Sequence, residues 1–117
     1  MIFILDETDL LHVADAEAEP QGAFEGIDVE NGIYRFFNES GSPLVPEFTV
    51  KNKRGTSFFG LSKWIWSGTY RLIACEDDSV PHLSEMLTKD TGLEPNKYFG
   101  DIDAVRRALK KVRDAAL

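Results

Sequence analysis

Apolar residues occur in short runs along most of this chain, and only its C-terminal end shows a long helical period. Met1–Leu5 is a continuous apolar run that stops at Asp6, which predicts a short buried strand. Further runs rich in β-branched and aromatic residues are typical of strands, and they cover Ile33–Asn38, Leu44–Lys51, Thr56–Phe59, Lys63–Trp66 and Thr69–Cys75. The middle of the chain is therefore predicted to be an antiparallel meander.

Turn-forming residues separate these runs. Asn52–Gly55 and Ser67–Gly68 have the composition of turns between neighbouring strands. Pro46 lies inside the run Leu44–Lys51 and cannot donate a hydrogen bond to a sheet ladder. This strand is therefore expected either at an edge of the sheet or beginning after Pro46.

Three segments are predicted to be helical. The clearest is the segment from Asp101 or Ile102 to near Leu117, because its apolar residues recur at spacings of three and four and form one seam, namely Ile102, Val105, Leu109, Val112 and Ala116. A second helix is expected over Val80–Thr91, capped by Asp78 or Ser79, and its apolar face is Val80, Leu83, Met86 and Leu87. A third is expected over Thr8–Glu19, capped by Asp6 or Thr8.

These elements predict an α+β domain that spans residues 1–117. Its expected architecture is a single-layer antiparallel meander of about four or five strands, packed against two C-terminal helices and one short N-terminal helix. The hydrophobic content of 43%, with eight Phe, three Tyr and two Trp, is sufficient for one core. An open sheet edge would also permit a homodimer.

Composition also predicts the compartment. Cys75 is the single cysteine, which excludes an internal disulfide and favours a reducing compartment. No run of the sequence approaches the roughly 18 apolar residues of a membrane span, and Met1–Leu5 is too short for a signal peptide. The protein is therefore expected to be cytoplasmic.

Charge is distributed unevenly along the chain. Residues 1–50 contain eleven acidic side chains and one basic one, whereas residues 51–117 contain nine acidic and twelve basic ones, so the net charges are −10 and +3 and together make −7. The acidic block, defined as Asp6–Glu30, contains nine carboxylates and no base. Such a block projects a negative field that attracts basic partners and disfavours nucleic acid.

The leading functional hypothesis is therefore a small acidic, non-enzymatic binding module. In size and acidity it is similar in type to inhibitor or immunity proteins that neutralise a basic protein partner. The residues predicted to bind this partner are carboxylates together with aromatic anchors beside them, namely Glu25, Asp28, Glu30, Phe24 and Tyr34, with Ile27 as a further anchor. The basic face of the last helix could bind an acidic partner, but we expect it mainly to neutralise the acidic half of its own domain.

An alternative hypothesis is binding of single-stranded nucleic acid. Basic and aromatic residues alternate in one region, which would supply phosphate neutralisation and stacking platforms; the candidates are Lys51, Lys53, Arg54, Trp64 and Trp66. The simpler interpretation places Trp64 and Trp66 in the core, since alternate residues of a strand share a face.

Enzymatic sites are weakly indicated, and we expect no cofactor and no metal. Gly55–Gly60 has the glycine spacing of a phosphate loop, but Leu61 and Ser62 follow where lysine is needed. Cys75 and His82 lack a favourable setting, because the three carboxylates between them disfavour a thiolate. Asp6, Glu7, Asp9, His12 and Asp15 could supply metal ligands, although no His-x-x-x-His or EF-hand spacing supports a site. A small enzyme with an unidentified pocket is the third hypothesis.

Overall fold

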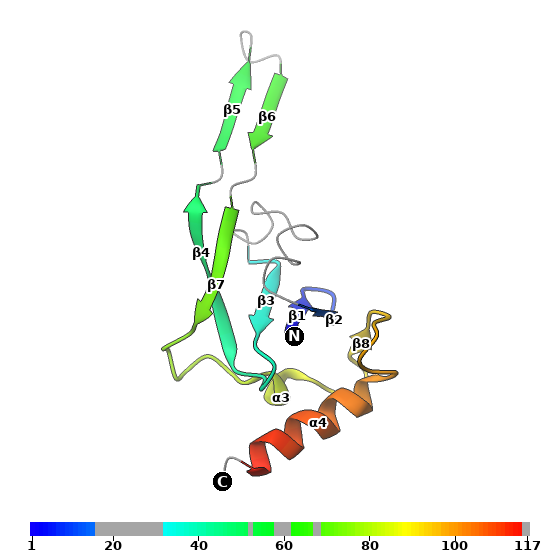
Figure 1. Ribbon diagram of the computed structural model, residues 1–117. Coiled ribbons are helices and arrows are strands. Elements are labelled where there is room, and N and C mark those ends of the chain that lie inside the picture. The colour runs from blue at the N-terminus through cyan, green and yellow to red at the C-terminus, as the bar shows by residue number, and fades with distance from the viewer. Residues whose placement is uncertain (16–31, 52, 58–61, 67–68, 116–117) are drawn as a thin grey trace.

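The computed structural model describes residues 1–15, 32–51, 53–57, 62–66 and 69–115. Within these ranges the chain forms a six-stranded sheet, a separate two-stranded sheet and two helices (Figure 1), which confirms the α+β class. The elements in chain order are β1 (Ile2–Asp6), β2 (Leu10–Ala14), β3 (Tyr34–Phe37), β4 (Pro43–Val50), β5 (Lys53–Ser57), β6 (Ser62–Trp66), β7 (Thr69–Ala74), α3 (Leu83–Met86), β8 (Gly92–Leu93) and α4 (Ile102–Ala115). Neither described helix is long and apolar enough to cross a membrane.

The large sheet has the strand order β7-β4-β3-β1-β2-β8. Its neighbours are antiparallel, except that β2 and β8 are parallel. The predicted N-terminal strand is confirmed as β1, and it lies inside the sheet, where Ile4 is opposite His12 of β2 on one side and Phe36 of β3 on the other. An unbroken apolar run suits this position, because both faces of β1 are buried.

Each face of the sheet carries its own hydrophobic cluster. On one face Phe3, Leu5, Leu11 and Phe37 pack with side chains from the helical end of the chain, namely Leu83, Leu87, Val105 and Leu109. The other face carries a second cluster, made of Ile4, Ala14, Phe36, Tyr70 and Leu72. Adjacent residues of a strand point to opposite faces, which is why Phe36 and Phe37 belong to different clusters. Burial raises the pKa of Tyr70 to about 12, with a smaller contribution from Tyr34, so this phenol stays neutral.

The predicted helix over Thr8–Glu19 is wrong for its described part, because residues 10–14 form strand β2. The chain reverses direction around the Asp6 carboxylate, whose Oδ1 accepts hydrogen bonds from the backbone N–H of Thr8 (2.8 Å) and of Leu10 (3.1 Å). Asp9 completes the turn with a φ of 61°, a left-handed conformation that Asp tolerates better than most residues. The backbone that would begin a helix is thereby used for a hairpin.

The expectation for β4 is also wrong, since this strand begins before Pro46 and lies between β3 and β7. Pairing with β3 ends at Leu44, whereas pairing with β7 continues to Val50. The carbonyl of Pro43 accepts from Cys75 on the β7 side, so positions of the opposite parity, which include Pro46, face the other side of the strand. The N–H that Pro46 lacks would therefore point to the side on which this part of β4 has no strand partner within the described ranges.

The two-stranded sheet of β5 and β6 continues the hairpin formed by β4 and β7. Figure 1 shows it extending away from the six-stranded sheet, along the long axis of a molecule that measures 59 × 29 × 23 Å. The predicted turn at Asn52–Gly55 is wrong for Lys53–Gly55, which belong to β5, and the predicted strand at Thr56–Phe59 begins three residues earlier, at Lys53. The predicted turn at Ser67–Gly68 lies outside the described residues.

The predicted helix over Val80–Thr91 is reduced to one turn, α3, at Leu83–Met86. His82, rather than Asp78 or Ser79, is its N-cap, and Leu87 is extended at φ −75°, ψ 134°, which ends the helix. The chain then enters β8, where the N–H of Gly92 donates to the carbonyl of Asp9. Leu83 and Leu87 nevertheless reach the core, as their predicted apolar face requires.

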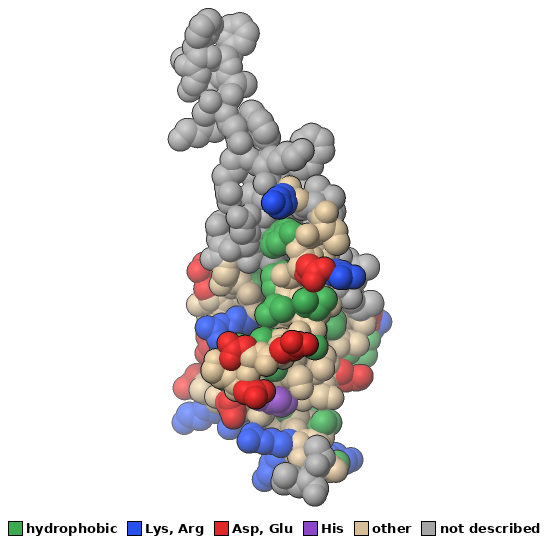
Figure 2. Space-filling view, turned by 90° about the vertical axis from the view of Figure 1, so that its left-hand side faces the viewer, with side chains coloured by type: hydrophobic (Ala, Val, Ile, Leu, Met, Phe, Trp, Pro, Cys, Tyr) green, Lys and Arg blue, Asp and Glu red, His purple; other side chains and the backbone are tan. Residues whose placement is uncertain are grey.

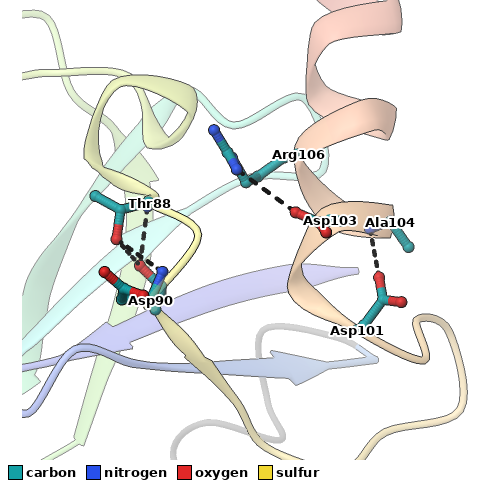
Figure 3. Close-up of polar contacts among 7 residues, drawn as sticks. Thr88, Asp90, Asp101, Asp103, Ala104 and Arg106 are labelled. Atoms are coloured by element: carbon teal, nitrogen blue, oxygen red, sulfur yellow. Dashed lines mark hydrogen bonds and ion pairs between the residues drawn. The ribbon is translucent and has the colours of Figure 1, made fainter.

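The C-terminal helix is confirmed as α4. The Asp101 carboxylate accepts from the N–H of Ala104 at 2.8 Å and caps the first turn (Figure 3). Val105 and Leu109 are buried and Ile102 packs beside them, whereas Val112 is 42% exposed, so the seam leaves the core before the helix ends. Ala116 lies outside the described residues.

Candidate functional site

The predicted partner-binding residues lie mostly outside the described ranges. Phe24, Glu25, Asp28 and Glu30 are not covered, and neither is Ile27, so their assignment stays a prediction. Tyr34 begins β3, where it is opposite Asp6 of β1 and packs beside the buried cluster that contains Phe36. Tyr34 is therefore a partly buried residue next to the described start of the acidic block.

Four carboxylates of the acidic block lie in the described part of the chain, and each has a different setting. Asp6 Oδ2 is 3.1 Å from His12 Nε2, and the Asp9 carboxylate accepts from the hydroxyl of Thr91. Asp15 contacts Lys97 Nζ at 2.8 Å and also accepts from the Tyr98 hydroxyl. Glu7 is exposed at the tip of the turn between β1 and β2.

Burial opposes ionisation of Asp6, but hydrogen bonds from Thr8, His12 and Leu10 outweigh it and lower the pKa of this carboxyl to about 2. Hydrogen bonds from Lys97 and Tyr98 likewise lower the pKa of Asp15. Both groups therefore stay negatively charged at neutral pH. A catalytic general acid needs the opposite shift, so Asp6 and Asp15 do not have the electrostatics of a proton donor.

The basic residues of the C-terminal half neutralise the acidic half only in part. Two ion pairs connect the halves within the described ranges, Lys97 to Asp15 and Arg71 to Glu47. The cations of α4 make neither of these pairs. Arg106 pairs with Asp103 on its own helix at 3.5 Å, and Arg113 approaches Glu85 of α3 at 4.0 Å. The expectation that α4 neutralises the N-terminal acids is therefore wrong among the residues described.

The charges of α4 instead gather at one end of the molecule. Figure 2 shows Lys and Arg side chains grouped at that end of the visible face, below a group of Asp and Glu side chains. From the sequence, the basic face of α4 was expected mainly to neutralise the acidic half of the domain, and the groove that its residues line was not predicted. The signal was available, since their spacing of three and four residues places them along one side of the helix, beside the buried seam, namely Arg106, Arg107, Lys110 and Arg113.

Four of the five residues of the nucleic-acid hypothesis belong to the β5–β6 ribbon, and three of these occupy positions on one face. Lys53 is opposite Trp66 and Gly55 is opposite Trp64. Opposed and alternate positions share one face of an antiparallel pair, so Lys53, Trp64 and Trp66 occupy positions on the same face. Arg54, opposite Ile65, occupies a position on the other face, and Lys51 is exposed beyond the end of β4.

The candidates for catalysis and metal binding are not assembled. Both ring nitrogens of His82 are used in the fold, because Nδ1 accepts from the N–H of Ser84 (3.1 Å) and Nε2 donates to the carbonyl of Ser40 (2.8 Å). The thiol of Cys75 instead approaches the carbonyl of Asp77. Within the ranges that the structure covers, no three His, Cys, Asp or Glu side chains are grouped so that they could hold a metal ion.

No protein-family model, curated protein or solved structure matches this chain.

Proposed function

We propose that this chain is a non-enzymatic binding module of the inhibitor or immunity type that recognises a basic protein partner through its acidic block. The supporting observation is that no cation of α4 pairs with a described N-terminal carboxylate, since Arg106 and Arg113 instead contact Asp103 and Glu85 of the C-terminal half. A negative field that is not cancelled from within speeds encounter with a basic partner and disfavours acidic ones. The unpaired thiol of Cys75 fits the cytoplasmic location that we assign to this function.

Charge and anchoring are assigned to different residues in this proposal. Glu25, Asp28 and Glu30 provide the negative charge, and Phe24 and Tyr34 provide apolar contact area. Aromatic anchors carry most of the affinity of typical interfaces, whereas exposed charges at the rim mainly set the association rate. Mutation of the carboxylates is therefore expected to change the salt dependence and the association rate first.

The test is capture of a partner from lysate on the immobilised protein at low and at high salt. Combining Asp28→Lys with Glu30→Lys should slow association about tenfold or more at low salt, because steering depends on the net local charge. The matched control is Glu76→Lys, which reverses an exposed carboxylate outside the acidic block. Capture that is insensitive to salt, or equally sensitive to the control, would contradict the proposal.

A second candidate function, binding of single-stranded nucleic acid, is favoured by the register of the β5–β6 ribbon. Its positions for Lys53, Trp64 and Trp66 share a face, in a sheet separate from the large one. Bases stack on aromatic rings while cations neutralise the phosphates. The overall charge of −7 opposes this function, so the ribbon would have to act locally.

Intrinsic fluorescence tests this candidate directly, because Trp64 and Trp66 are the only two tryptophans of the chain. Titration with a single-stranded oligothymidylate at low salt should quench their emission, and Lys53→Glu should weaken the quenching about tenfold, as expected for loss of a phosphate contact. Lys89→Glu, which changes an exposed lysine near α3, should leave the titration curve unchanged. Emission that stays constant during the titration would exclude stacking on this ribbon.

A further inference from the structure

A groove of about 390 Å³ lies between α3 and the exposed face of α4. Its walls come from one stripe of α4 and from Ser84 of α3, and the stripe consists of Asp103, Arg106, Arg107, Lys110 and Arg113. The stripe borders the buried side of α4, where Val105 and Leu109 face the core, and its own side chains are exposed. Four cations and one carboxylate therefore line a groove on a chain whose net charge is −7.

The four cations differ in whether they already contact a carboxylate of the chain. Arg106 contacts the Asp103 carboxylate at 3.5 Å (Figure 3). Arg113 donates to the hydroxyl of Ser84 at 3.3 Å and lies 4.0 Å from Glu85, which fixes it across the end of the groove. Arg107 and Lys110 form no ion pair with any residue in the described part of the chain. The groove thus presents two cations that form no ion pair within the described part of the chain.

A second groove, of about 370 Å³, adjoins the first at Arg113. It is lined by Ser40, Ser42, His82 and Val112 in addition to that arginine. The imidazole of His82 is a rigid wall, because both of its nitrogens are hydrogen-bonded within the fold. Val112 is 42% exposed here and is one of the few large apolar side chains on the described surface. A cationic groove therefore continues into a small apolar one.

We propose that the α4 groove binds an acidic segment of a partner protein in an extended conformation, with carboxylates at Arg106, Arg107 and Lys110 and one apolar side chain at Val112. The stripe from Asp103 to Arg113 is about 15 Å long at the helical rise, a length that about four or five extended residues cover. Alternate side chains of such a segment lie about 7 Å apart on one side, close to the spacing of about 5–6 Å between successive turns of a helix.

Carboxylates suit this groove better than phosphates do. Asp103 lies within the groove, and Glu85 lies 4.0 Å from Arg113 at its end. These two negative charges repel a phosphate group, which carries about two charges at one point, more strongly than they repel single carboxylates spread along the groove. The adjoining Val112 adds a contact that an acidic segment with an apolar residue can use and that an inorganic anion cannot. This site has the opposite charge to the acidic block, so either surface can function without the other.

The probe for the first test is a short fluorescein-labelled peptide of glutamates with one leucine at its end, and the readout is fluorescence anisotropy with the intact protein. Measurement at about 0.15 M salt limits repulsion by the distant acidic residues, since the screening length is then about 8 Å. Combining Arg107→Glu with Lys110→Glu should weaken binding about tenfold or more. Lys111→Glu is the matched control, because Lys111 is exposed on the same helix but does not line the groove, and it should change Kd less than about twofold.

Several outcomes would overturn the proposal. The first is that the peptide does not bind, and the second is that Lys111→Glu weakens binding as much as the double reversal does. The third is that pyrophosphate displaces the peptide as effectively as unlabelled peptide of the same charge, which would identify a phosphate site instead. Val112→Ser should weaken the leucine-containing peptide but not an all-glutamate peptide. If the double reversal does not fold, as judged by circular dichroism, Arg107→Gln with Lys110→Gln removes the same charges and should still weaken binding.

Discussion

Replacing Gly41 by alanine is expected to lower the free energy of unfolding by about 2 to 4 kcal/mol, a large part of the stability of a small domain. Gly41 has a φ of +84°, which costs an L-residue about 1 kcal/mol or more. A Cβ at this position would lie 2.5 Å from Cε1 of His82 and 3.0 Å from Cδ2 of Leu109. The imidazole cannot move away without losing its bonds to Ser40 and Ser84, so the loop before β4 would have to shift instead.

That shift would also affect the helices. The carbonyl of Gly41 accepts from the N–H of Leu83 at 2.9 Å, the first residue of α3. Gly32→Ala is the matched control, because Gly32 also has a positive φ, +75°, but has open space where its Cβ would be. Urea unfolding should show a loss of only about 1 kcal/mol for the control. Equal losses in the two variants would mean that the contact with His82 contributes nothing beyond the backbone conformation.

Replacing Asp6 by asparagine is expected to destabilise the protein by about 2 kcal/mol at neutral pH and to have little effect near pH 2. The folded pKa of Asp6, about 2, lies below its ordinary value of 3.8. Folding therefore favours the ionised carboxylate, and this contribution to stability is present above about pH 4 to 5. It is lost as the pH falls through the ordinary value and toward the folded one, because both states then bind the proton.

The measurement is the difference in unfolding free energy between the natural protein and Asp6→Asn at several pH values from 7 down to about 2. The difference should shrink over the acid part of this range. Asp77→Asn is a useful comparison, since the Asp77 carboxylate accepts from the N–H and hydroxyl of Ser79 in a similar turn but is exposed. It should have a clearly smaller effect. A difference for Asp6→Asn that does not vary with pH would show that its charge is not what holds the hairpin.

Elements defined by a local sequence pattern were predicted, whereas elements that depend on pairing with a distant strand were not. The apolar run that became β1 and the seam of α4 were correctly predicted, because each pattern fits one kind of element and has clear ends. The segment Leu10–Ala14 has neighbouring apolar residues that suit a helix or a strand equally well. Its pairing with β1, from Ile2 opposite Ala14 to Leu5 opposite Leu11, decided in favour of a strand. The available local signal was Asp6–Asp9, a polar turn between two apolar runs.

The second helix shows the same limit. Leu83 and Leu87 have the spacing of a helical face, and both are buried. After Leu87 the chain continues to β8, which pairs in parallel with β2 and places Gly92 opposite Leu10. A Cβ on Gly92 would be 3.0 Å from Cδ1 of Leu10, so this glycine permits a close approach rather than ending a helix. A contact across most of the chain length cannot be predicted from local propensity.

For the candidate site, the sequence predicted the distribution of charge but not the positions of the charged side chains in the fold. The sequence shows that the two halves differ in sign, but which charges meet depends on the fold. Lys97 reaches Asp15, whereas the cations of α4 turn toward α3 and solvent. The α4 groove needs both the buried side of α4 and the position of Ser84, and the second of these follows from the short α3 that the sequence pattern did not predict.

The central place of β1 also has a consequence for how the protein is made. Its Phe3 and Leu5 are covered by Val105 and Leu109 of α4, which follow at the far end of the sequence. A ribosome adds residues from the N-terminal side first, so Phe3 and Leu5 are made before the helix that covers them. Until α4 has been made, β1 lacks part of its cover, and in this interval a chaperone would protect it from aggregation.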